Sequence, residues 1–336
     1  MSEKKPYKIN IPAMIDGETE RLDKVIASNS NIMSRNAAQK AIEAGLVQVN
    51  SKTVFDKKMP VSCVDDISIE MTAIESHKKN IVVSPEDKNP YVIYEDNSII
   101  IVNKPAGLLV HPTAKQSDDT LVNRLIFHFP EIKNVGESFR PGIVHRIDQY
   151  TSGLLVVART VEAYEALIDL FQTHNITREY FALIHGNIKE ESGTIDTLID
   201  RDESFRLKRK VSEDRGVHAI THFEVVERFG NYTFVKLTLE TGKTHQIRVH
   251  MSYIKHPIVG DPLYGAKGDL ATTENKSIFV SKDGTKVKNI HGQLLHAGVL
   301  GFMHPSQHEY VEFRVPIPED FNQIINKLRT SKASNH

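Results

Sequence analysis

Short apolar runs rich in β-branched residues recur along most of this chain and restrict it to a fold built chiefly from strands. They lie at residues 99–102, 154–158, 180–185, 221–226 and 233–239. One clear helical pattern, at residues 161–173, interrupts them. Because strands without regular intervening helices favour antiparallel pairing, we expect an α+β domain with a mixed, mostly antiparallel central sheet.

A smaller unit with a different rhythm precedes this region. A helical pattern begins at Arg21, Ser34 is a suitable N-cap for a second helix, and Gly45 stands where the C-terminal cap of that helix belongs. Alternating apolar and polar residues then predict short strands at 46–50, 53–55 and 65–70. These signals predict a compact αββ-type module.

Polar segments separate the parts of the chain. The expected units are the small module at 15–75, a linker at 76–89, the large domain at 90–328 and a disordered tail at 329–336. Within the large domain, the polar, Lys-rich residues 266–290 predict a loop.

Composition limits where the chain works and how it binds partners. The 42 basic and 43 acidic residues give a net charge of −1, so any attraction to a nucleic acid must come from local patches. The single cysteine, Cys63, makes no internal disulfide, which favours a reducing compartment. No signal peptide or membrane-length apolar stretch is evident. We expect a cytoplasmic protein without a membrane partner.

The segment that carries most chemical information is His145-Arg-Ile-Asp-Gln-Tyr-Thr-Ser-Gly-Leu-Leu155. Asp148 stands between two apolar runs, beside Arg146 and a Thr-Ser-Gly turn, so we expect it to project from a loop into a cleft. By itself, such an aspartate more often forms a turn than catalyses a reaction. Three further segments combine polar residues with glycines, at 178–186, 240–265 and 293–297.

Together these segments resemble the RluA-type pseudouridine synthases, whose signature reads His-Arg-Leu-Asp-x-x-Thr-Ser-Gly-Leu-Leu. The resemblance implies a central, mostly antiparallel sheet with the active site in a cleft across it. It also implies roles for individual residues. Asp148 is the catalytic aspartate, Arg146 fills the space left by an extruded base, Tyr180 is the active-site tyrosine, Arg248 pairs with the aspartate, and Leu295 lines the uracil pocket.

The third segment, Gly242-Lys-Thr-His-Gln-Ile-Arg248, adds Lys243 and His245 as substrate-binding residues. Two departures from the family pattern stand out. Gln149 and Tyr150 replace the usual basic or Met residue and acidic residue, and Lys243 replaces a more frequent arginine, which preserves charge but alters bidentate contacts.

The small module resembles the S4 RNA-binding domain. Its Arg-Leu-Asp-Lys helix start, Ser-Arg cap and Gly-Leu-Val-x-Val-Asn strand all match, at 21–24, 34–35 and 45–50. The resemblance implies a basic face for phosphate contacts, made by Arg21, Lys24, Arg35, Lys40 and Lys52, together with Lys57 and Lys58.

These residue types suit pseudouridylation, which breaks the C1′–N1 bond, turns the uracil and rejoins it through C5. An ionised carboxylate serves as nucleophile or as base, and Arg248 beside Asp148 favours the charged form. Flipping the uridine out of the RNA costs roughly a few kcal/mol, offset by filling the gap and stacking the base. Tyr180 suits stacking or removal of the C5 proton, and the sequence does not distinguish them. No redox step is involved, so no cofactor is expected.

Other enzyme readings fit the sequence less well. Gly242-Lys243-Thr244 lacks the first glycine of a phosphate-binding loop, since Leu237 stands in its place. A kinase catalytic loop would need an asparagine where Gly153 stands. His245 and His250 have no third ligand at useful spacing, so no metal is predicted.

Two functional alternatives stay open at this stage. A glycosidase acting through Asp148 would need a second carboxylate, which nothing near it in the sequence supplies. A catalytically idle RNA-binding or ribosome-assembly protein would have no need to keep Asp148, Tyr180 and Arg248 together. The expected partner is structured RNA, with large-subunit ribosomal RNA ahead of transfer RNA, and the chain is expected to be a monomer.

Overall fold

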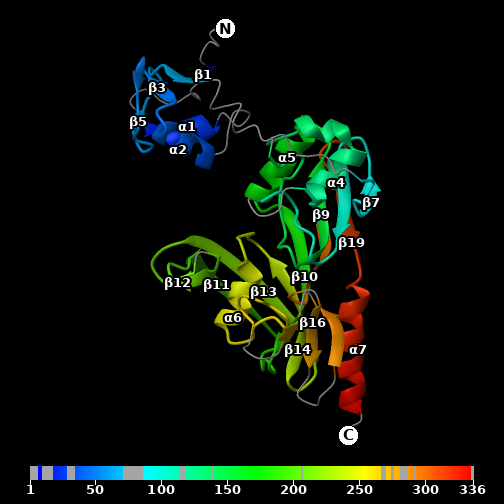
Figure 1. Cartoon of the computed structure of the whole chain (residues 1–336). Helices are drawn as coiled ribbons and strands as arrows, with labels where there is room; N and C mark the ends of the chain where they lie inside the picture. Colours follow the sequence, from blue (N-terminus) through cyan, green and yellow to red (C-terminus); the bar gives the residue numbers. More distant parts are fainter. Residues whose placement is uncertain are drawn as a thin grey trace.

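The chain forms a small N-terminal unit and a large α+β unit (Figure 1). The computed structural model describes residues 7–9, 18–28, 35–70, 86–113, 118–137, 139–205, 207–265, 270–273, 276–280, 286–290 and 292–333. No described helix is both long and apolar enough to cross a membrane.

The small unit packs two short helices on a small sheet. Its elements are β1 (Tyr7–Ile9), β2 (Glu20–Arg21), α1 (Leu22–Ser28), α2 (Arg35–Glu43), β3 (Val47–Val49), β4 (Lys52–Thr53), β5 (Pro60–Val61) and β6 (Ile67–Ile69). One sheet runs in the order β1-β6-β3-β4, and β2 pairs with β5.

The predicted C-terminal cap of α2 is present. Gly45 has a positive φ of 73°, and its N–H donates to the Ile42 carbonyl, while the Leu46 N–H reaches back to Ala41. This paired pattern closes helices that end on a glycine. The predicted N-cap Ser34 lies outside the described residues.

The large unit is organised by one ten-stranded sheet with the order β12-β11-β13-β14-β10-β18-β9-β8-β7, in which β19 also pairs with β18. Only the β18–β9 pair is parallel among the described pairings of this sheet, so the predicted mixed, mostly antiparallel sheet is confirmed. Its strands are β7 (Val92–Glu95), β8 (Ile99–Lys104), β9 (Ser152–Ala158), β10 (Ile176–His185), β11 (Ser192–Arg201), β12 (Arg209–Ser212), β13 (Val217–Arg228), β14 (Tyr232–Leu239), β18 (Leu295–Met303) and β19 (Tyr310–Arg314).

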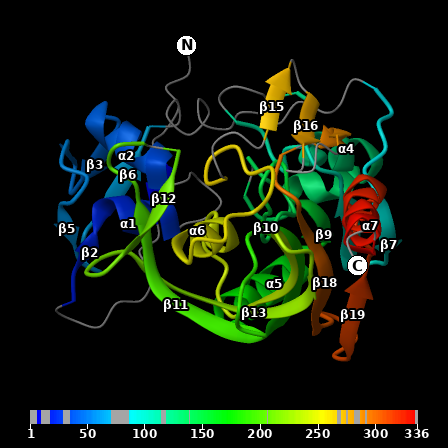
Figure 2. The ribbon, with the colours of Figure 1, turned by 90° about the horizontal axis from the view of Figure 1, so that it is seen from below.

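Helices cover both faces of this sheet. They are α4 (Leu121–His128), the 3-10 helix η1 (Pro130–Asn134), α5 (Val161–Gln172), α6 (Gln246–Tyr253) and α7 (Glu319–Ala333). Figure 2 shows β11 and β13 curving around α6. The helix predicted at 161–173 is α5, which ends one residue earlier than expected.

The middle of the sheet is buried on both faces. Along β9, Leu155 and Val157 pack into the core cluster beside α4, while Leu154 and Val156 pack into the cluster beside α5. Each such side chain stabilises the fold by roughly 1.5–3 kcal/mol. The loop that carries Asp148 leads directly into β9, so it starts from one of the most firmly packed strands of the molecule.

Two predictions about the C-terminal third are wrong. The expected loop at 266–290 contains a three-stranded antiparallel sheet, with strands β15 (Leu270–Thr273), β16 (Lys276–Val280) and β17 (Lys286–Ile290). The expected tail is helical as far as Ala333, because Phe321, Ile324 and Ile325 recur at helical spacing and bury one face of α7. Of the predicted linker at 76–89, residues 76–85 lie outside the described residues.

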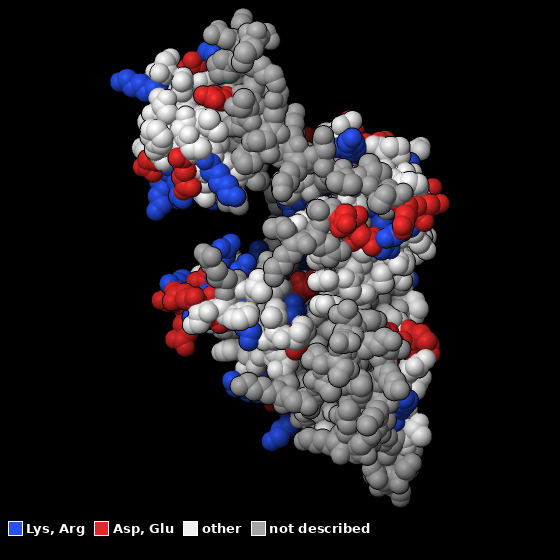
Figure 3. Space-filling view, viewed as in Figure 1, with Lys and Arg blue, Asp and Glu red and all other residues white. Residues whose placement is uncertain are grey.

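Basic and acidic side chains are intermixed on the surface. Figure 3 shows Lys and Arg beside Asp and Glu over both units on the face in view, with no extended area of one sign. The distribution agrees with the net charge of −1.

Candidate active site

The predicted catalytic aspartate projects from a short loop. The Asp148 carbonyl accepts from the Thr151 N–H at 3.1 Å, which turns the chain into β9. The next residue, Gln149, bonds Gly107 twice: its carbonyl accepts from the Gly107 N–H at 2.9 Å, and its side-chain amide donates to the Gly107 carbonyl at 3.0 Å. The departure from the family pattern at Gln149 therefore serves to hold the loop.

A buried lysine also holds this loop, through bonds to backbone carbonyls. Lys104, at the end of β8, is fully buried, and its Nζ donates to the carbonyls of Pro105, Leu108 and Gln149 at 2.8–2.9 Å. Burial lowers the pKa of Lys104 to about 7, and the nearby negative charge of Asp148 opposes part of that shift. The backbone that carries Asp148 is thereby tied to the central sheet.

Arg248 joins two carboxylates. It projects from α6 and donates through Nη1 to Asp148 Oδ2 at 2.7 Å, and through Nε and Nη2 to both oxygens of Asp261 at 2.7 and 2.8 Å. The Asp261 side chain is 0% exposed and that of Asp148 is 20% exposed. Although burial lowers the pKa of Arg248, the bonds to Asp261 and Asp148 raise it above its ordinary value. A permanently charged guanidinium therefore faces Asp148.

Tyr180 and Leu295 line the same cavity as this ion pair. Tyr180 is on β10, where the pairing with β18 shifts register between Glu179 and Tyr180. Such a bulge re-aims a side chain, and here the phenol lines the same cavity as Asp148. Burial raises the pKa of Tyr180, so its hydroxyl stays protonated at neutral pH. Leu295 begins the neighbouring β18 and is also buried at the cavity wall.

The loop before α6 brings Lys243 and His245 to the cavity. Gln246 shapes this loop, since its Oε1 accepts from the Thr241 hydroxyl at 2.8 Å and from the Lys243 N–H at 2.9 Å. His245 adopts the left-handed conformation with φ 59°. Its Nδ1 lies 2.9 Å from the Tyr264 hydroxyl and its Nε2 lies 3.8 Å from Asp148 Oδ1.

Arg146 lies at the exposed rim of the cavity. Its Nη1 donates to His111 Nε2 at 2.7 Å. Burial and the charge of Arg146 both lower the pKa of His111, so its ring is neutral and free to accept.

The cavity itself is small. Its volume is about 60 Å³, and it is lined by Arg146, Ile147, Asp148, Thr151, Tyr180, Leu239, Lys243, His245, Gln246, Ile247, Arg248 and Leu295. Ligand pockets usually measure roughly 300 Å³ or more, so a nucleoside enters only if rim side chains move. All seven residues predicted for catalysis or substrate binding line this one cavity. Within the described ranges, no three His, Cys, Asp or Glu side chains form a group suited to a metal ion.

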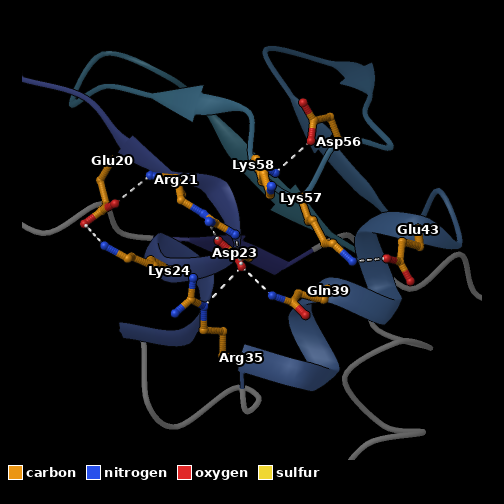
Figure 4. A network of polar contacts seen from close by, with 10 residues as sticks. All are labelled: Glu20, Arg21, Asp23, Lys24, Arg35, Gln39, Glu43, Asp56, Lys57 and Lys58. Atoms are coloured by element: carbon orange, nitrogen blue, oxygen red, sulfur yellow. Dashed lines mark hydrogen bonds and ion pairs between the residues drawn. The ribbon is translucent and has the colours of Figure 1, made fainter. Parts of the chain in front are cut away.

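The basic residues predicted for the small unit differ in whether they form ion pairs within it, and Figure 4 shows several of those pairs. Arg21 and Arg35 both donate to the buried carboxylate of Asp23, which also accepts from Gln39 at 2.6 Å. Lys24 pairs with Glu20, and Lys57 pairs with Glu43. Lys40 and Lys52 are exposed and make no ion pair with any described residue. Two of the five predicted contact residues are thus also part of an internal network.

Comparison with known proteins decides the family. Residues 98–253 match the RNA pseudouridylate synthase family model, and residues 20–67 match the S4 domain model. The uncharacterized RNA pseudouridine synthase YlyB of Bacillus subtilis is 41% identical over 322 residues, which span 96% of this chain and 98% of that protein. The chain belongs to the RNA pseudouridine synthase family.

Other relatives extend this result. The ribosomal large subunit pseudouridine synthase D of Vibrio parahaemolyticus is 37% identical over 310 residues, 92% of this chain and 91% of that protein. Among solved structures, human RNA pseudouridylate synthase domain containing 1 superposes with a TM-score of 0.52 at 25% identity, covering 73% of this chain and 97% of that one. The predicted resemblances to the RluA-type enzymes and to the S4 domain are confirmed, and this synthase is an isomerase.

Sequence reasoning missed two residues that organise the site of the synthase. Asp261 lies in the polar segment at 240–265 but was given no role, although its position in Val259-Gly-Asp-Pro-Leu-Tyr264 marks a polar residue between apolar ones. Lys104 gave a signal too, because it stands two residues after the apolar run at 99–102, where the predicted strand ends. Neither signal reveals its partners, which lie up to 45 residues away for Lys104.

Proposed function

We propose that this synthase converts specific uridines of large-subunit ribosomal RNA to pseudouridine, with Asp148 as the catalytic carboxylate. The observation that carries the assignment is the Asp148–Arg248–Asp261 arrangement, which holds one partly exposed carboxylate in a small cavity beside a fixed guanidinium. The RNA class comes from the relatives named as ribosomal large subunit pseudouridine synthases.

In the proposed reaction, Asp148 acts on the sugar while the C1′–N1 bond breaks. As a nucleophile it bonds to C1′ and is released when C5 takes its place; as a base it removes a proton from the sugar and later returns it. The uracil then turns within the cavity, a C5–C1′ bond forms, and the C5 proton leaves to solvent as N1 gains one. Atoms therefore balance without any cofactor. Arg248 supports the step by keeping a positive charge against the Asp148 carboxylate.

Tyr180 and Leu295 hold the turned base in this scheme. The Tyr180 ring provides a stacking surface. Burial raises the pKa of Tyr180 and keeps its hydroxyl protonated at neutral pH, so the hydroxyl can accept the C5 proton only while its own proton passes to water. Leu295 closes the pocket against the apolar edge of the base. Lys243 and His245 contact the nucleotide from the loop before α6.

Arg146 couples base flipping to opening of the cavity. In the RNA-free chain it rests on neutral His111 at the rim. When RNA binds, Arg146 leaves His111 and fills the gap left in the RNA stack, which opens the cavity to the flipped uridine. Filling the gap offsets part of the flipping cost of a few kcal/mol.

The S4 unit anchors the RNA. We place this unit at residues 15–75 and the catalytic domain at 90–328, with Arg21, Lys24, Arg35, Lys40 and Lys52 as its phosphate contacts. Lys40 and Lys52 reach the RNA without giving up an ion pair, whereas Arg21 and Arg35 contact it while remaining bound to Asp23. A cytoplasmic monomer that meets ribosomal RNA during assembly fits this arrangement.

The test is a pseudouridine map of total RNA from cells with and without the gene. Loss of sites in large-subunit ribosomal RNA, restored by the wild-type chain, is the expected result. Loss confined to transfer RNA would keep the enzyme and replace its substrate. If no site is lost in cells that have no second synthase for the same uridines, the substrate assignment fails.

A further inference from the structure

A second cavity lies beside the active site, between the β11–β12 pair and the loop before α6. Its volume is about 330 Å³, and it is lined by Ile199, Asp200, Arg201, Arg209, Gly216, Val217, Gly242, Lys243 and Thr244. Three of these side chains are cationic: Arg201, Arg209 and Lys243. The one acidic side chain, Asp200, is paired with Arg215, whose Nε lies 3.3 Å from Asp200 Oδ2.

Arg209 lines this cavity and carries an unused hydrogen-bond donor. Its Nη1 is buried and has no hydrogen-bond acceptor among the described residues. Burying a guanidinium N–H without an acceptor is a cost to the fold. The fold therefore holds Arg209 ready for an acceptor that the described part of the chain does not supply.

The strand register gives a second, independent indication of an anion site. Arg201 on β11 and Arg209 on β12 are direct partners across the antiparallel pair, and both line the cavity. Like charges placed opposite each other in a sheet destabilise the pair. An anion between them would turn this repulsion into attraction, and two arginine forks suit the oxygens of a phosphate.

The cavity is directly connected to the catalytic centre. Lys243 lines both cavities. The Arg209 N–H donates to the Tyr264 hydroxyl at 2.7 Å, and that hydroxyl lies 2.9 Å from His245 Nδ1, whose ring faces Asp148. A phosphate held here would thus belong to the strand that enters the active site.

We propose that this cavity binds a backbone phosphate of the RNA next to the target uridine, with Arg209 as its principal contact and Arg201 and Lys243 as supporting charges. This inference rests on the proposed function, because it assumes that RNA is the strand that fills the catalytic cavity. It assigns to the β11–β12 pair the task of fixing the position of the substrate strand.

The test compares Arg209→Gln with Lys210→Gln. Lys210 is the next residue of β12, is exposed, and does not line the cavity, so it is a matched control for charge. The rate of pseudouridine formation is measured with the full chain on an unmodified large-subunit ribosomal RNA transcript, over roughly 50 to 200 mM salt.

Arg209→Gln should raise KM about tenfold and leave kcat within about twofold. The slope of the logarithm of the RNA-binding constant against the logarithm of the salt concentration should become shallower by about one. Lys210→Gln should leave all three unchanged. Arg209→Lys keeps the charge and should keep the salt slope, which separates a phosphate contact from a loss of packing. Melting curves of each variant verify that the chain is folded.

A folded Arg209→Gln chain with the KM and salt slope of the wild type would overturn the inference. If the wild type forms no pseudouridine in this transcript, the substrate proposal fails instead. The salt slope of binding to the same transcript then still tests the phosphate site, because it depends on the number of phosphates contacted and not on turnover.

Discussion

The two arginine–aspartate networks of this synthase are built in opposite ways. In the S4 unit the carboxylate is inside: Asp23 is 0% exposed, while its partners Arg21 and Arg35 are 35% and 46% exposed. In the catalytic domain the cation is inside, since Arg248 is 5% exposed and reaches from fully buried Asp261 to Asp148, which is 20% exposed.

The difference suits the same pair of residue types to the two roles proposed for them. A buried aspartate with surface arginines orders cations that point to solvent, which suits contacts with phosphate. A buried arginine held by one aspartate presents a second carboxylate to a cavity, which suits chemistry on a bound base. The exposure of each partner, and not the presence of an ion pair, distinguishes the two networks.

The largest effect on stability should follow from Asp261→Asn. It leaves the buried Arg248 with a single charged partner, and breaking a buried pair costs about 3–5 kcal/mol of stability. We also expect kcat to fall about 10- to 100-fold, because Arg248 no longer fixes Asp148. Asp96→Asn is the control: Asp96 accepts from Ser98, Ile99 and His304 far from the cavity, so it should lose stability with unchanged kcat. Equal kcat for both variants would refute the positioning role of Asp261.

Asp23→Asn should weaken RNA binding and leave kcat nearly unchanged, the opposite of Asp261→Asn. Arg21 and Arg35 lose the partner that orders them, at a cost of about 1–3 kcal/mol of stability. RNA affinity should weaken while kcat at saturating RNA stays within about twofold, as measured by turnover and by binding under the same conditions. A loss of kcat comparable to that of Asp261→Asn would remove the contrast between the two networks.

Acid should affect the S4 network in a defined pH window. Burial raises the pKa of Asp23, but hydrogen bonds from Arg21, Gln39 and Arg35 outweigh it and lower the pKa to about 2. A folded-state pKa below the unfolded value means that the stabilisation is complete above about pH 4 and is lost as the pH falls towards 2, by at most about 2 kcal/mol. Denaturant unfolding of the wild type and Asp23→Asn at successive pH values should show their difference shrink in this window. A difference that does not change with pH would contradict the assignment.

The smallest effect belongs to an exposed pair in the same unit. Lys24 and Glu20 are 47% and 42% exposed, so Lys24→Gln should change stability by less than about 1 kcal/mol. If Lys24 contacts a phosphate, the salt slope of RNA binding becomes shallower by about one charge. A large loss of stability would show that surface exposure does not determine how much such an ion pair stabilises the fold.

Local sequence patterns predicted five strands of the central sheet, β8, β9, β10, β13 and β14, together with helix α5 and the glycine cap of α2, because periodicity and turn chemistry act over a few residues. The resemblance to a known family supplied Asp148, Tyr180 and Arg248, which the fold brings to one cavity. The strands β15 to β17 were missed because they are short and contain Lys and other polar residues, as in Lys286–Ile290, so no sustained apolar pattern marks them.

The partners of buried groups were beyond prediction from local pattern. Arg248 and Asp148 lie 100 residues apart, and nothing near Arg248 indicates that Asp261 also binds it. The same is true of α7, where Arg329 donates to Glu227 of the distant strand β13 at 2.8 Å. Such contacts exist only once the chain has folded.

The most direct measurement is the single-turnover rate of Asp148→Asn on the RNA that the wild type modifies, with binding measured in parallel. Asparagine keeps the shape, and Arg248 keeps its two bonds to Asp261, so the fold and the RNA affinity should persist. We expect a rate at least about 10⁴-fold lower and an affinity within about twofold of the wild type. Asp196→Asn, which changes an exposed carboxylate on β11, should be as active as the wild type. Substantial turnover by folded Asp148→Asn would contradict the account.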